Sequence, residues 1–72
     1  MKYTVIYNGK SVTRYGDTAL EAIEKICDRH GWNYQLKDFD TVTGGRMWAE
    51  CAVDTKRGTD WNMTILAIQK ED

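Results

Sequence analysis

The sequence predicts an α+β domain in which an antiparallel sheet of about five strands carries one helix on one of its faces. Five segments alternate apolar and polar residues with the period of a strand, and one segment repeats its apolar residues at helical spacing. Their order along the chain is ββαβββ, which suits a single helix packed on an antiparallel sheet. With 72 residues there is room for one domain, residues 1–72, and for one thin core. One helix therefore covers one face of the sheet and leaves the opposite face open.

A β-hairpin is expected at the start of the chain, from residues 1–7 and 10–15. Asn8-Gly9 lies between them and favours a type I′ turn, because both central residues of that turn need a positive φ angle. A two-residue loop fixes the register, and three cross-strand pairs follow: Tyr7 with Lys10, Val5 with Val12, and Tyr3 with Arg14. Four side chains share the predicted core face: Tyr3, Val5, Tyr7 and Val12.

A helix is predicted over residues 19–30. Thr18 and Glu21 have the spacing of a capping box, and Gly31 supplies the left-handed residue that commonly ends a helix. The predicted core-facing stripe has side chains at helical spacing: Ala19, Ile23, Ile26, Cys27 and His30, with Leu20 beside them.

The remaining three strands are predicted over residues 32–43, 46–54 and 61–69. In the first of them the alternation slips at Asp38-Phe39, and a β-bulge there would return Phe39 to the apolar face. The last strand is apolar on both faces from Ile65 to Ile68, which is typical of a strand in the centre of a sheet.

Aromatic residues are the least ordinary feature of the composition, with three Trp and four Tyr. Trp48 alternates with Met47 and Ala49, so it points away from the core if they point into it. Leu66 and Ile68 share the face of Trp48 only in some registers of the last strand, which the loop before it does not fix. Such a cluster on an open face would be a partner or dimer surface. The alternative is that Trp48 lies flat across a polar face and stabilises cross-strand pairs.

Charge is nearly balanced overall but uneven along the chain. The formal net charge of -1 argues against a general nucleic-acid coat protein and against an acidic DNA mimic. Residues 1–16 hold three cations and no acid, and Lys56-Arg57 forms a basic pair in a polar loop. Two candidate sets follow. The partner-binding set consists of Trp48, Arg14, Arg46, Lys56 and Arg57. The alternative nucleic-acid-binding set consists of Lys10, Arg14, Lys56 and Arg57.

The residue types and their spacing give little indication of a catalytic or metal-binding site. Cys27 and His30 share a helix face, but a closed zinc site needs four ligands, and only Cys51 remains of the strong ligand types. Their place on an apolar stripe would desolvate the thiol and raise its pKa rather than activate it. No nucleophile, base and orienting group can be assembled. We therefore expect neither an enzyme nor a cofactor or metal site.

The compartment is expected to be the cytoplasm. Two cysteines are fewer than a small secreted domain usually carries, and the N-terminus lacks the apolar region of a signal peptide. The longest apolar run, from Ile65 to Ile68, is far too short to span a bilayer, so no membrane partner is expected.

Three segments carry a resemblance to a known class of proteins: Thr18-Ala19-Leu20-Glu21-Ala22-Ile23, Gly45-Arg46-Met47-Trp48-Ala49 and Trp61-Asn62-Met63-Thr64-Ile65. In layout the chain resembles the small anti-CRISPR proteins encoded by phages and mobile elements, several of which pair a bent antiparallel sheet with one helix. The resemblance implies a protein that binds a CRISPR effector complex in the host cytoplasm and blocks DNA access or recruitment. That class has no common signature, so it assigns no residue a role.

The expectation is thus a non-enzymatic interaction protein, an inhibitor from a phage or mobile element, that binds a protein partner through a basic and aromatic surface. The expected partner is a protein, alone or as part of a nucleoprotein effector complex. A weak nucleic-acid-binding module is the alternative function, and a homodimer is left open.

Overall fold

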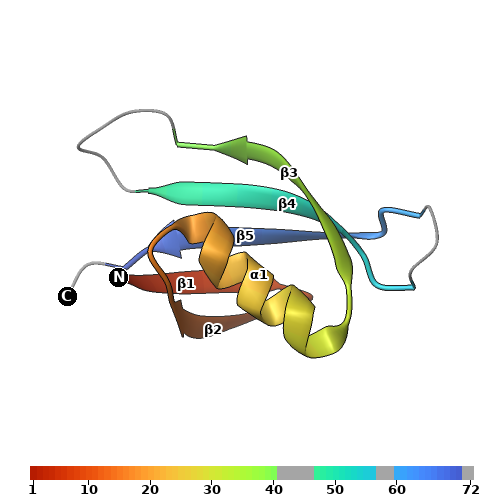
Figure 1. Ribbon diagram of the computed structural model, residues 1–72, viewed down its shortest axis with the longest axis horizontal. Helices are drawn as coiled ribbons and strands as arrows, with labels where there is room; N and C mark the ends of the chain where they lie inside the picture. The colour runs from red at the N-terminus through yellow and green to blue at the C-terminus, as the bar shows by residue number, and fades with distance from the viewer. Residues whose placement is uncertain (41–46, 57–59, 71–72) are drawn as a thin grey trace.

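The structure, a computed structural model, describes residues 1–40, 47–56 and 60–70, and within them it forms one five-stranded antiparallel sheet with one helix on one face (Figure 1). The elements in chain order are β1 (Lys2–Tyr7), β2 (Lys10–Tyr15), α1 (Ala19–His30), β3 (Asn33–Phe39), β4 (Trp48–Asp54) and β5 (Met63–Gln69). This confirms the α+β class and the order ββαβββ. Across the sheet the strands run β2-β1-β5-β4-β3, so β5 lies in the centre, as its two apolar faces predict. Within the described residues no helix has the length and apolar character needed to cross a membrane.

The β1–β2 hairpin has the predicted turn and register. Asn8 and Gly9 both adopt positive φ angles, of 50° and 73°. The three predicted pairs form: Tyr7 with Lys10, Val5 with Val12, and Tyr3 with Arg14. Local turn chemistry is therefore sufficient to set this part of the sheet.

Both ends of α1 are capped by the residues that the sequence indicates. The Thr18 hydroxyl accepts the backbone N–H of Glu21 at 3.1 Å. The Glu21 carboxylate accepts the backbone N–H of Asp17 at 3.3 Å, one residue before the cap, so the reciprocal half of the capping box is displaced by one position. At the other end Gly31 adopts a left-handed φ of 72° and its N–H bonds to Asp28.

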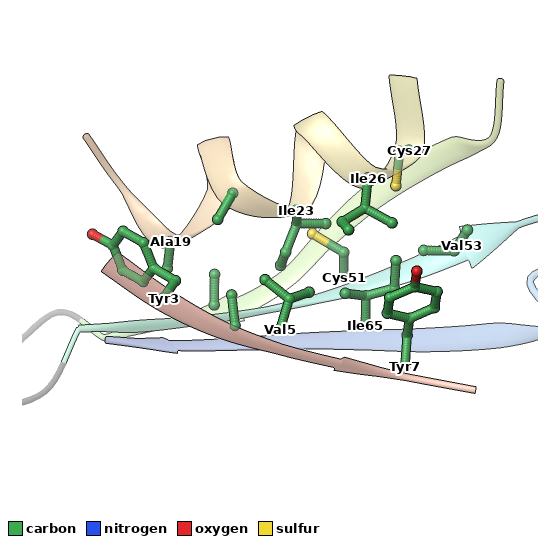
Figure 2. Packing of buried hydrophobic residues seen from close by; sticks show 13 residues of the cluster. Tyr3, Val5, Tyr7, Ala19, Ile23, Ile26, Cys27, Cys51, Val53 and Ile65 are labelled. Carbon is green, nitrogen blue, oxygen red and sulfur yellow. The ribbon is translucent and has the colours of Figure 1, made fainter. Parts of the chain in front are cut away.

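The core fills the space between α1 and one face of the sheet (Figure 2). Its buried members are Tyr3, Val5, Tyr7, Ala19, Ala22, Ile23, Ile26, Cys27, Ala49, Cys51, Val53, Ile65 and Ala67. One residue of the predicted helix stripe does not belong to it, since His30 is exposed. Its ring stacks instead on Trp32, with centroids 4.1 Å apart and planes 11° apart. The stripe ends at Cys27 because the chain turns at Gly31 and offers His30 an aromatic surface outside the core.

A register shift interrupts the pairing of β3 with β4. It lies between Leu36 and Asp38, so the extra residue is Lys37, one position before the predicted bulge at Asp38-Phe39. As predicted, the shift returns Phe39 to the helix side of the sheet, where it pairs with the buried Ala49. Phe39 is nevertheless half exposed, because β3 is the edge strand and α1 lies over the more central strands (Figure 1).

The turn at Gly9 makes a direct prediction about stability. Gly9→Ala is expected to lower the free energy of unfolding by about 1 kcal/mol, because a side chain at positive φ is strained. An added Cβ would meet no atom within 4 Å, so crowding contributes nothing to the loss. Gly9→Asn is the matched control, since Asn tolerates this conformation, and it should cost less in urea unfolding. Equal losses for the two variants would contradict the backbone explanation.

Candidate functional site

The face of the sheet opposite α1 carries a small apolar cluster. Trp48 on β4 pairs directly with Ile68 on β5, and Leu66 on β5 pairs directly with Ile6 on β1. Directly opposed residues point to the same face, and these four alternate with the buried residues of their strands. We call them the outer patch: Ile6, Trp48, Leu66 and Ile68. The register left open by the sequence is thereby set, with Leu66 and Ile68 on the face of Trp48.

No described helix or strand covers the outer patch. Ile6 is 42% exposed, and the other three side chains are partly buried by their neighbours on the sheet. Ile6 is the member that sequence reasoning missed as a site residue. Its outward direction follows from alternation along the first strand, but its place beside Leu66 depends on the pairing of β1 with β5, which no local signal indicates.

Charged residues flank the outer patch on two sides. Glu50 on β4 pairs with Asp38 on the edge strand β3 and with Leu66 on β5, so two acidic residues are cross-strand neighbours beside the outer patch. Like charges at this spacing destabilise a sheet slightly. On the other flank are Lys2 and Lys70, whose backbones are joined by a hydrogen bond of 2.8 Å from the Lys70 N–H to the Lys2 carbonyl. The outer patch therefore has an acidic side and a basic side.

Among the described residues, the structure does not bring the predicted cations together with Trp48. Arg14 pairs with the buried Tyr3, and Lys10 pairs with the buried Tyr7, so both lie on the helix side of the sheet. The guanidinium of Arg14 donates to the carbonyl of Thr13 at 2.8 Å. The ammonium of Lys10 lies 5.0 Å from the centre of the Tyr7 ring.

Lys56 is also separated from Trp48, because Trp48 begins β4 and Lys56 follows its last residue, Asp54; the strand between them spans about 20 Å at 3.3 Å per residue. Lys56 and Lys10 lie at the same end of the sheet, but β1 and β5 stand between their strands, a spacing of about 14 Å. Arg46 and Arg57, the remaining members of the two sets, lie outside the described residues.

An aromatic cluster that the sequence does not indicate lies at the hairpin end of the sheet. The ring of Trp32 meets the ring of Tyr7 edge-on, with centroids 6.1 Å apart and planes 76° apart, and stacks on His30 with its face. Trp32 thus packs against the end of the core, whereas Trp48 lies on the open face of the sheet.

No family model matches the chain, and no curated protein or solved structure matches it. These comparisons assign no activity or ligand, so the arrangement of the residues themselves carries the functional argument. Its main feature is an apolar patch, flanked by opposite charges, on a sheet face that no described element covers.

The two thiols lie inside the core. Burial raises the pKa of Cys27 to about 12 and that of Cys51 to about 11, with nearby negative charges as the lesser cause. His30 is exposed, so no imidazole lies in the core to activate Cys27. Among the described residues, no group of three or more His, Cys, Asp or Glu could hold a metal ion. In the part of the chain that the structure describes, Asp54 is the buried acidic residue, and its carboxylate accepts the backbone N–H of Lys56 at 3.1 Å.

The thiols give a prediction about reactivity and pH. Both should resist a disulfide reagent such as Ellman's reagent at pH 8 in the folded protein and react fully in urea, which serves as the control. An unfolded thiol loses its proton near pH 9, whereas Cys27 keeps its proton to about pH 12 in the folded chain. The unfolded state therefore binds fewer protons in this window, and the free energy of unfolding should fall as pH rises from 9 to 12. Rapid reaction of either folded thiol at pH 8 would contradict this picture.

Proposed function

We propose that this chain is a small non-enzymatic protein-binding module whose contact surface is the outer patch. The observation that supports the proposal is the direct pairing of Trp48 with Ile68 and of Leu66 with Ile6 on an uncovered sheet face. Small soluble domains seldom leave contiguous apolar groups exposed without a binding role. Tryptophan is also the residue type that most often dominates the energy of a protein interface.

The charges beside the outer patch define the chemistry of the partner. A partner surface with an apolar centre and a basic residue facing Glu50 and Asp38 would relieve the repulsion between these carboxylates. Acidic groups of the partner would face the side of Lys70. This arrangement differs from a basic and aromatic surface, because Arg14 and Lys10 lie on the opposite face of the sheet.

The proposed biological role is inhibition, in the manner implied by the resemblance to small anti-CRISPR proteins of phages and mobile elements. An inhibitor that occupies a surface of a host effector complex in the cytoplasm needs a contact face and no catalytic group. The comparisons neither support nor oppose this role, which rests on the layout of the chain and on the outer patch.

A capture experiment with matched tryptophan variants tests the proposed surface. Wild type, Trp48→Ala and Trp61→Ala are immobilised and exposed to nuclease-treated host lysate. Trp61 is the control because it is 46% exposed but follows the loop at the far end of β4. A partner of the outer patch should be retained by wild type and by Trp61→Ala and lost with Trp48→Ala. With that partner purified, Trp48→Ala should weaken binding about 30-fold or more.

Charge reversal provides the second arm. Glu50→Lys should weaken the same interaction, whereas Lys10→Glu on the opposite face should not. Equal recovery of every protein by wild type and Trp48→Ala would remove the outer patch as the binding surface. The nucleic-acid alternative predicts instead a gel shift that weakens with salt and with Lys10→Glu.

A further inference from the structure

A cavity of about 270 Å³ lies on the helix side of the sheet, at the end where α1 begins. We call it the edge cavity, and its lining comes from three elements and their ends: Thr18, Ala19, Leu20, Leu36, Phe39, Asp40, Met47, Trp48 and Ala49. Apart from Trp48, which borders both features, it shares no residue with the outer patch. The two lie on opposite faces of the sheet, because Ala49 points toward α1.

The cavity lies where small side chains of α1 and β4 meet the part of edge strand β3 that follows its register shift. Ala19 points from the first turn of α1 toward the sheet (Figure 2), and Ala49 is a buried residue of β4. Neither is large enough to fill the space between helix and sheet at this end. The first half of β3 is held to α1 by the Tyr34 hydroxyl, which donates to the Glu24 carboxylate. The extra residue Lys37 shifts the pairing register between this first half, which ends at Leu36, and the second half, which begins at Asp38.

The walls are apolar, and part of them is in contact with water. Leu36 is 39% exposed and Phe39 is 50% exposed, although both lie on the helix side of the sheet. Two polar residues belong to the lining: Thr18, whose hydroxyl caps α1, and Asp40, whose backbone N–H donates to the Trp48 carbonyl at 2.9 Å. Among the described residues that line the cavity there is no lysine or arginine. Its surface favours an uncharged apolar group, whose entry would release water from Leu36 and Phe39.

The volume selects the size of that group. An apolar cavity of roughly 150 Å³, engineered in another protein, holds benzene, whereas pockets for drug-sized ligands begin at roughly 300 Å³. The edge cavity falls between them, which suits one fused bicyclic ring. We propose that the edge cavity is a binding site for a single uncharged aromatic ring system of the size of indole. The ring belongs either to a free small molecule or to a tryptophan side chain of a peptide. Because Trp48 borders both the edge cavity and the outer patch, indole binding is tested at residues that belong to one of the two alone.

An NMR titration of the whole 72-residue protein with indole tests the site. Indole should shift the amide signals of Ala19, Leu20, Phe39 and Ala49 in a saturable way, with a dissociation constant on the order of 0.1–1 mM. A parallel titration with the peptide Gly-Gly-Trp-Gly-Gly distinguishes the sources. Tighter binding of the peptide identifies a polypeptide ligand, and tighter binding of indole identifies a free small molecule.

Three variants show where the probe binds. Ala49→Leu fills the cavity and should weaken indole binding at least tenfold. Because added volume at a buried position can also disturb the fold, Phe39→Ala provides a second variant at a half-exposed wall, with the same expected loss. Ile6→Ala, in the outer patch, is the control and should leave indole binding unchanged. The proposal is overturned if indole produces no saturable shifts, or if Phe39→Ala binds it as tightly as wild type.

Discussion

The packing of α1 on the central strands is the constraint on which the rest of the structure depends. Ile23 and Ile26 of the helix are buried against residues of β1, β4 and β5, and this contact decides which face of the sheet is inside. A helix of 12 residues covers about 18 Å of length and roughly 10 Å of width. Five strands at about 4.8 Å spacing form a sheet about 19 Å wide, which exceeds the width of the helix. The helix therefore leaves Leu36 and Phe39 of the edge strand β3 partly exposed, and no described helix lies on the opposite face.

The two candidate sites are consequences of this shortage of cover. On the open face, β5 remains apolar because it is central, and Leu66 and Ile68 find Ile6 and Trp48 as neighbours. On the helix side, the edge strand carries Leu36 and Phe39 beyond the reach of α1. Both surfaces keep apolar side chains in contact with water. Polar residues at these exposed positions would remove that contact and would leave the buried core unchanged. That contrast favours a binding role for them over a structural one.

Features that depend on neighbouring residues could be predicted from the sequence, and features that depend on distant pairing could not. The Asn8-Gly9 turn, the Thr18 cap and the end of α1 at Gly31 follow from local chemistry. The place of β1 beside β5 depends on residues about sixty positions apart, and it alone puts Ile6 next to Leu66. His30 continues the helical spacing but leaves the core because Trp32, beyond the helix, stacks on it. Likewise, Arg14 and Lys10 are separated from Trp48 because strand alternation places them on the helix side of the sheet and Trp48 on the open face.

The charges beside the outer patch determine the orientation of a bound partner, which apolar contact alone does not. Burial of Trp48 and Ile68 against a partner would be favourable in many orientations, because the hydrophobic effect has no preferred angle. Glu50 with Asp38 on one flank and Lys70 on the other make those orientations unequal, since a partner turned by half a circle would meet like charges. The paired carboxylates weaken the isolated sheet slightly, and a cationic partner group would remove that repulsion on binding. For the proposed partner, the apolar centre thus contributes affinity and the charged flanks determine the angle of approach.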